Sequence, residues 1–251
     1  MSVVLRPAPN WTLRVAVGMV AALAVLAVIL VLPSFLLSLE ADYETATAEK
    51  RVLELVDGSV AVMAPESAIA IEYSETTRIV RLLEGEAFFY VTPNPDRPFR
   101  VTAGDATAST VGATFNVRMR SDHARISVRH GLVDVANGAG QPMDAPLEAG
   151  HWMKDAGDDD FVRGSGRYQD VGRWTQDELS VGDRRLGDLV DDMRRYIPGV
   201  ILLLDSELSN ERVTNSTFNL DNPNRALRNI ASRRGAEVRQ LLPGVLLVSR
   251  D

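Results

Sequence analysis

Residues 51–63, RVLELVDGSVAVM, decide the fold of this chain. Apolar and polar residues alternate ahead of Asp57-Gly58, a dipeptide that favours a tight turn between two strands, so the stretch predicts a β-hairpin. Further short apolar or alternating runs cover residues 69–73, 78–83, 87–91, 99–102, 114–119, 125–129 and 132–135. Strands of this length and spacing are typical of a sandwich, a barrel or a β-solenoid, so we expect an all-β domain over residues 51–155.

The composition changes after this domain. Residues 155–166, DAGDDDFVRGSG, are acidic and rich in glycine. Their three adjacent aspartates lack the alternating ligand spacing of an EF-hand calcium loop. A solvated loop is the simpler interpretation, and we expect a linker over residues 156–178.

From about Leu179 the apolar residues follow the period of a helix. Leu186, Leu189 and Met193 fall on one helix face, and Pro198-Gly199 is expected to end that helix. The remaining expected elements are a strand over residues 200–204, a strand over residues 212–220, a helix capped by Asn222 and opened by Pro223, and a hairpin over residues 238–249. This order predicts a small α+β domain over residues 179–251.

Ahead of both domains, residues 15–39 form an uncharged run between Arg14 and Glu40. As a helix of roughly 37 Å, this run would cross a hydrocarbon core about 30 Å thick. Arg6 and Arg14 are the charged residues before it, which favours a cytoplasmic N-terminus and a body on the far side of the membrane. A cleaved signal peptide is the alternative, although its apolar core is normally shorter.

The expected fold class is therefore a single transmembrane helix followed by an all-β, solenoid-like or sandwich-like domain and a small α+β domain. Residues 1–14 would be a short cytoplasmic segment, residues 15–39 the transmembrane helix and residues 40–50 a stalk. The expected location is the inner (cytoplasmic) membrane, with a single pass and a periplasmic body. The chain has no cysteine, so no disulfide would support an exported body. A net charge of −7 argues against binding nucleic acid through its phosphates.

The residues that could carry chemistry are few. The chain has three isolated histidines, and none of them lies in a metal-ligand spacing such as H-E-x-x-H: they are His123, His130 and His151. Residues 164–166, Gly-Ser-Gly, do not form the G-x-S-x-G elbow of a hydrolase. We therefore expect a protein that is not an enzyme, with no catalytic, cofactor-binding or metal-ligating residue and no cofactor.

The aspartates have simple structural interpretations. Asp57, Asp183 and Asp205 lie where turns or helix caps need a carboxylate. Asp191-Asp192 is expected on the solvent face of its helix. Residues 245–249 are a candidate edge strand for binding a partner by strand addition, or a central strand.

The ordered motifs resemble FecR-type transmembrane regulators. The resemblance rests on residues 52–62, 78–89, 97–101, 111–117 and 128–135, and it extends over residues 40–251. The tail from Leu179 is similar to the small module that ends these proteins, which is related to the short N-terminal domain of secretins and TonB-dependent receptors.

The resemblance implies a function in cell-surface signalling. Such proteins cross the inner membrane once, and their periplasmic part senses the signalling domain of a TonB-dependent outer-membrane receptor, often one occupied by an iron–siderophore. Their cytoplasmic N-terminal domain holds or activates an extracytoplasmic-function (ECF) sigma factor. The expected partners are thus that receptor, an ECF sigma factor and the inner membrane, without nucleic acid.

Two features depart from the family pattern. Residues 1–14 are too short for the usual cytoplasmic anti-sigma domain, so we expect that domain to be lost, encoded separately or omitted by the choice of start codon. Some relatives cleave themselves at a Gly-Thr bond, where this chain has Gly112-Ala113. That reaction needs a hydroxyl at the second position, so we predict no self-cleavage here. The alternatives to a signalling regulator are a membrane-anchored envelope scaffold and, third, an envelope enzyme.

Overall fold

The computed structural model describes residues 39–120, 123–143, 145–157, 160–214 and 216–250, together with Val15, Met19, Ala21, Val25, Leu26, Leu32 and Leu37. The chain divides into two compact units, Met1–Ala41 and Asp42–Asp251. In the first unit, the described residues up to Glu40 are helical.

The fold class expected from the sequence is wrong, because it opened with a membrane-spanning helix. No helix formed by the described residues is both long enough and apolar enough to cross a membrane. Residues 1–14 and most of residues 15–39, on which that expectation rested, lie outside the described residues. The described body is predominantly β-structure, and its first strands form a single sheet rather than the separate turns of a solenoid.

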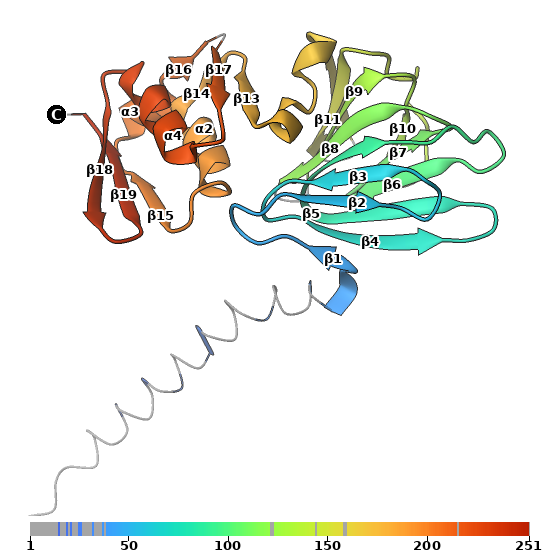
Figure 1. The fold of residues 1–251 in the computed structure, drawn as a ribbon, viewed down its shortest axis with the longest axis horizontal. Coiled ribbons are helices and arrows are strands. Elements are labelled where there is room, and N and C mark those ends of the chain that lie inside the picture. The colour runs from blue at the N-terminus through green and yellow to red at the C-terminus, as the bar shows by residue number, and fades with distance from the viewer. Residues whose placement is uncertain are drawn as a thin grey trace, which may run out of the picture. The chain divides into compact units, whose positions relative to one another are not determined.

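Twelve strands of the second unit pair into this sheet (Figure 1). Their bounds are β1 (Tyr43–Glu44), β2 (Arg51–Glu54), β3 (Val60–Met63), β4 (Ala68–Tyr73), β5 (Arg78–Tyr90), β6 (Phe99–Ala103), β7 (Ala106–Thr110), β8 (Thr114–Arg120), β9 (His123–His130), β10 (Asp134–Ala136), β11 (His151–Gly157) and β12 (Asp160–Ser165). The main path is β10-β7-β6-β5-β8-β9-β11-β12. Antiparallel pairing of β2 with β3 confirms the predicted hairpin over residues 51–63.

The acidic stretch over residues 155–166 is not the loop that its composition indicated. Most of it lies in β11 and β12, which pair as a hairpin at the edge of the sheet. Trp152 and Met153 precede the stretch in β11, and Phe161 and Val162 lie in β12. Along β11 the burial alternates, with Met153 and Asp155 buried and Lys154 exposed, and this strand period outweighs the composition.

Strand β5 gives the sheet its two layers. Residues 78–84 pair with β4, and residues 78–81 also pair with β6. Residues 85–90 pair with β8, and the last four also pair with β3. The change of partners falls at Gly85, where φ is +85° and a Cβ would collide with the Glu66 carbonyl and the Ser67 hydroxyl. Glycine alone adopts this backbone without strain, and the sheet bends there.

One hydrophobic core lies between the two layers. Phe89, from the second half of β5, contacts Phe99 of β6 and Phe115 of β8, with ring centroids 5.7 and 5.4 Å away. Val80, Leu82, Val101, Val117, Ile126 and Leu147 are among the other buried members. Packing of both halves of β5 into one core fixes the bend at Gly85.

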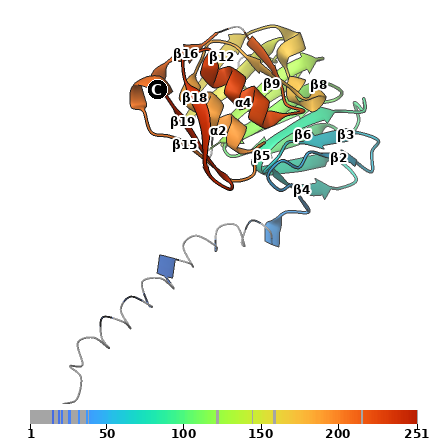
Figure 2. The same ribbon diagram turned by 60° about the vertical axis from the view of Figure 1, so that its left-hand side comes forward.

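The rest of the second unit is smaller and mixes helices with short strands (Figure 2). Its elements are η1 (Tyr168–Asp170), η2 (Arg173–Gln176), β13 (Glu178–Val181), β14 (Arg184–Arg185), α2 (Leu186–Arg194), β15 (Val200–Leu203), α3 (Ser206–Asn210), β16 (Arg212–Val213), β17 (Ser216–Asn219), α4 (Pro223–Ser232), β18 (Glu237–Leu242) and β19 (Val245–Ser249). We call residues 178–250 the C-terminal module. The domain boundaries expected from the sequence stay predictions.

Local signals placed the two longer helices of the module correctly. Helix α2 begins at Leu186 and buries Leu189 and Met193. Helix α4 begins at Pro223, and the Asn222 side chain accepts a hydrogen bond from the Arg225 N–H at 3.0 Å. Helix α3 was not expected. Strand β19 pairs with β15 on one side and β18 on the other, so residues 245–249 are a central strand and not an edge.

The module shares a second core with the outer face of the sheet. Phe88 of β5 and Val62 of β3 belong to the same buried cluster as Leu189 and Leu227 of the module, and Trp174 of η2 is also a member. Residues 87–89 are therefore fully buried on both sides of β5, which accounts for their unbroken apolar run. Sheet and module are parts of one compact body.

Candidate functional site

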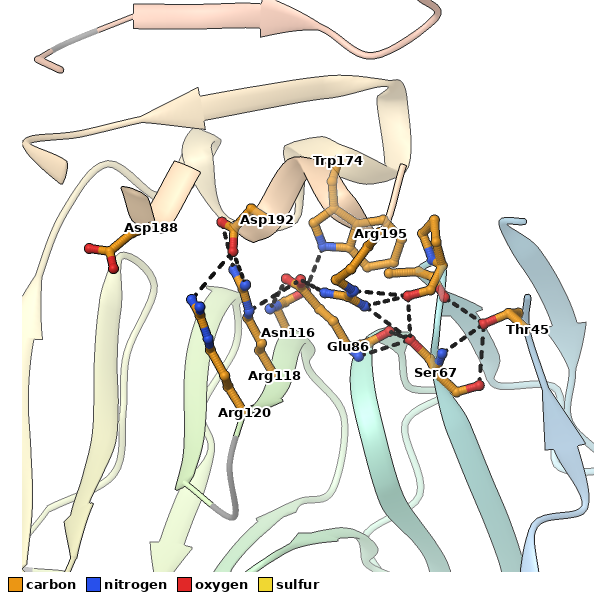
Figure 3. A network of polar contacts seen from close by, with 12 residues as sticks. Thr45, Ser67, Glu86, Asn116, Arg118, Arg120, Trp174, Asp188, Asp192 and Arg195 are labelled. Carbon is orange, nitrogen blue, oxygen red and sulfur yellow. Dashed lines mark hydrogen bonds and ion pairs between the residues drawn. The ribbon is translucent and has the colours of Figure 1, made fainter. Parts of the chain in front are cut away.

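The last turn of α2 meets the sheet through a buried carboxylate, Asp192. Its side chain is 4% exposed. The Arg118 guanidinium of β8 donates to both carboxylate oxygens (Figure 3). Arg184 donates to Oδ2 at 2.6 Å. Burial alone would raise the pKa of Asp192, but the charges and hydrogen bonds of Arg118 and Arg184 hold it below its ordinary value. Arg120 of β8 lies 3.7 Å from Oδ1 of the same carboxylate, so Asp192 is a buried anion held by three cations.

In a second contact between the end of α2 and the sheet, the helix end supplies the cation and the sheet supplies the anion. Arg195, the C-cap residue that follows α2, lies 3.3 Å from the Glu86 carboxylate of β5 and donates to the Pro65 carbonyl at 3.0 Å through Nε. Asn116 of β8 donates to Glu86 at 3.0 Å and accepts from the Trp174 indole N–H, also at 3.0 Å. The chain of contacts runs from η2 through the sheet to α2 (Figure 3).

Together these two contacts form what we call the junction network: Glu86, Asn116, Arg118, Trp174, Arg184, Asp192 and Arg195. The helix supplies an anion and a cation three residues apart, and the sheet supplies the matching cation and anion. Arg118 also lies 3.8 Å from Glu86, which links the two pairs. Burial alone would lower the pKa of Arg118, but Glu86 and Asp192 raise it above the ordinary value. A network of this kind fixes one orientation of the helix on the sheet.

Asp192 was expected on the solvent face of its helix, and this expectation is wrong. It lies three residues after Leu189 and one before Met193, so it shares the buried face of α2. Asp191 does lie at the surface, with a side chain 37% exposed that pairs with Arg120 at 2.8 Å and Arg194 at 2.6 Å. Adjacent identical residues thus have different environments.

Beside the junction network lies a groove of about 940 Å³. It is bordered by β8, β9 and β11 of the sheet, by the connection over residues 165–174, and by β13 and α2 of the module. Eight of its lining side chains are arginine or lysine and six are aspartate or glutamate: Arg118, Arg120, Arg125, Lys154, Arg167, Arg173, Arg184 and Arg195, against Glu86, Asp170, Glu178, Asp183, Asp188 and Asp192. The groove is therefore cationic in a chain whose net charge is −7.

The histidines are spread over the sheet. His123 Nδ1 lies 3.4 Å from the Asp155 carboxylate, His130 packs its ring against Tyr168, and Nδ1 of His151 is buried without a partner among the described residues. Within the described part of the chain, no three His, Asp or Glu side chains gather where they could hold a metal ion. Ser165 of the Gly-Ser-Gly stretch is the last residue of β12.

The other aspartates have structural contacts. Asp57 follows β2 and accepts from Arg78 at 2.6 Å and from the Ser59 hydroxyl at 2.6 Å. Burial would raise the pKa of Asp57, but these hydrogen bonds lower it below the ordinary value. Asp205 caps α3 by accepting from two backbone N–H groups, and Asp183 pairs with Arg212 at 2.7 Å.

Two features of the sequence indicate the junction network, although they were not part of the sequence-based prediction. Arg118 and Arg120 alternate with apolar residues in β8, so they share one face of the sheet beside a buried strand. Asp192 lies within the apolar stripe of α2. A charged residue on a buried face requires a partner, and this requirement links the two observations.

Comparison with known proteins places these features in context. Residues 41–134 match the family model described as FecR protein. Two solved structures of a candidate anti-sigma factor from Parabacteroides distasonis are similar to this chain, with TM-scores of 0.73 and 0.72. Each is 21% identical in sequence, and the similarity covers 83% of this chain and 98% of the other. No curated protein matches the chain. At this identity the solved structures show a shared fold.

Proposed function

We propose that this chain regulates a sigma factor, because residues 41–134 form a FecR-type domain. The family match supports this function, and the similar fold of the Parabacteroides candidate anti-sigma factor agrees with it. The observation that carries the proposal is the junction network. A regulator must convert binding at one surface into a change elsewhere, and the network couples the module to the FecR sheet through buried charges.

The proposed signal comes from a TonB-dependent outer-membrane receptor linked to iron–siderophore uptake, and the proposed output is an ECF sigma factor. In this proposal the receptor's signalling domain binds the C-terminal module, and the described body lies in the periplasm. The route from the body to the sigma factor includes a cytoplasmic anti-sigma segment, which a separate chain could supply.

Deletion of the gene followed by RNA sequencing tests the regulatory function. We expect transcripts that depend on one ECF sigma factor to change when the gene is deleted, and to recover on complementation. If no sigma-dependent transcript changes, the chain is not a sigma-factor regulator, and the alternative of an envelope scaffold is favoured.

Two further measurements test the finer parts of the proposal. Pull-down with the signalling domain of the receptor encoded nearby should retain the full chain, and absence of binding would count against the receptor. A phosphatase fused after residue 250 should be active if the body is periplasmic, and an inactive fusion of normal abundance would contradict that location.

A further inference from the structure

A row of three cationic side chains crosses neighbouring strands beside the junction network. Arg118 of β8 lies directly opposite Arg125 of β9, and Arg125 lies directly opposite Lys154 of β11. Residues directly opposite each other in antiparallel strands share one face, with Cβ atoms about 5 Å apart. Like charges in this position destabilise a sheet. We call Arg118, Arg125 and Lys154 the cationic row.

One member of the row is neutralised by the protein. Arg118 binds Asp192 and lies near Glu86. Neither Arg125 nor Lys154 forms an ion pair with any carboxylate of the described residues, and both are exposed to the groove. Burial and the nearby charges of Arg184 and Arg118 lower the pKa of Arg125 below its ordinary value. Within the described part of the chain, the row therefore presents two uncompensated charges to the groove.

The acidic residues of the groove are mostly bound elsewhere. Asp170 and Glu178 both bind Arg173, and Asp183 binds an arginine of β16. Asp188, on α2, has no ion pair within the described part of the chain and is the acidic side chain that a bound anion would have to avoid. Counted over the described residues, the uncompensated charge on the sheet side of the groove is positive.

Arg125 is held in place by an aromatic side chain. Its guanidinium carbon lies 4.1 Å from the centroid of the Trp152 ring, a stacking contact that leaves the N–H donors free. Trp152 lies opposite Gly164 of β12, and a Cβ at that glycine would collide with the indole. The absence of a side chain at Gly164 thus gives Trp152 the room to lie under Arg125. The cation is positioned before any ligand arrives.

Another part of the groove wall is the strand β13. Glu178, Leu179 and Ser180 of β13 all line the groove in succession. Because side chains alternate along a strand, three successive lining residues indicate that its edge borders the groove. Among the described strands, β13 pairs with β17 alone, which leaves its second edge without a partner strand. An unpaired edge accepts an extended polypeptide by backbone hydrogen bonding.

We propose that this groove binds an extended acidic segment of a partner polypeptide, with its backbone along β13 and its carboxylates on Arg125 and Lys154. The charge of the row selects an anion, and the free strand edge selects a polypeptide. The proposal does not depend on the sigma-factor function. Nucleic acid is disfavoured as the occupant because the chain as a whole carries a net charge of −7.

A labelled octaglutamate peptide titrated into the full chain at low salt tests the proposal. The test variant is Arg125→Gln with Lys154→Gln, and the matched control is Arg100→Gln with Arg228→Gln, which removes the same charge at exposed positions of β6 and α4. We expect the control to bind like the parent chain and the test variant to bind ~10-fold or more weakly, with affinity falling as salt rises. Octaglutamine should bind weakly.

Hydrogen exchange provides a readout on the parent chain if the test variant fails to fold. Bound octaglutamate should slow exchange of the outward backbone N–H groups of β13, whereas glutarate and inorganic phosphate should not. No binding of octaglutamate, equal affinity of the test and control variants, or glutarate and phosphate binding as tightly as the peptide would each overturn the proposal.

Discussion

Neutralising Asp192 should destabilise the described body more than any other single loss of charge in the junction network. Asp192→Asn keeps the shape of the side chain but leaves Arg118, Arg120 and Arg184 facing a neutral group. Removal of one partner from a buried ion pair typically costs about 3–5 kcal/mol of unfolding free energy.

The structure places the expected loss at the lower end of that range. Arg118 keeps Glu86 at 3.8 Å, and the Arg184 side chain is 30% exposed, so water can hydrate part of its charge. We therefore expect a loss of about 3 kcal/mol. For a body of this size, each kcal/mol lowers the melting temperature by about 2–4 °C, so the change is large enough to measure without ambiguity.

Urea unfolding at neutral pH, followed by tryptophan fluorescence, measures this loss. Trp174 lies in the network, so one of the three tryptophans that contribute to the emission lies at the junction. The matched control is Asp191→Asn, one residue earlier on the same helix, where the exposed carboxylate should contribute less than about 1 kcal/mol. Equal stability of the two variants would refute the reasoning, because it would mean that the Asp192 pair contributes no more than a surface pair.

Three further results are expected. The pKa of Asp192 is held below its ordinary value of 3.8, so its contribution to stability is fully present above about pH 4 and is lost as the pH falls further. The stability of Asp192→Asn should therefore fall less steeply in acid than that of the parent chain, and parallel curves would contradict this. Gly85→Ala should lower the unfolding free energy by more than ~1 kcal/mol in urea, since alanine neither adopts the positive φ nor fits against Glu66, and an unchanged midpoint would show that the bend tolerates a Cβ. The Gly112–Ala113 bond should stay intact, and a purified fragment that ends at Gly112 in mass spectrometry would disprove this.

Local patterns in the sequence predicted correctly those elements that depend only on residues close together in the chain. The hairpin at Asp57-Gly58 and the start of α4 at Asn222-Pro223 follow from turn and cap chemistry within a few residues. The loop predicted for residues 155–166 was wrong because its acidic composition masked the period of β11, in which Met153 and Asp155 are buried and Lys154 is exposed. Composition is a weaker guide than period.

The junction network could not be assembled from local patterns. Arg118 and Asp192 are far apart in the sequence, and only the packing of the module on the sheet brings them together. The same holds for the cationic row, whose members lie on β8, β9 and β11 and meet through strand register. Charged residues on buried or shared faces were present in the sequence, but their partners depend on tertiary structure.

The spanning helix in the expected fold class was not found for a different reason, and the expected membrane location stays a prediction. The hydropathy of residues 15–39 shows that the segment is apolar. It does not show that the segment forms one helix long enough to cross a membrane, which the expected fold class required. Within the described residues no such helix is found, and most of that range lies outside them.

The most direct test of the central claim uses a promoter that depends on the ECF sigma factor, in a strain that lacks the gene. Complementation with the parent chain or with Asp191→Asn should restore normal regulation of the promoter, whereas Asp192→Asn, at equal protein abundance, should leave the promoter as in the deletion strain. Normal regulation by Asp192→Asn, or a promoter unaffected by the deletion itself, would contradict the claim that this chain regulates a sigma factor through the junction between its module and its FecR sheet.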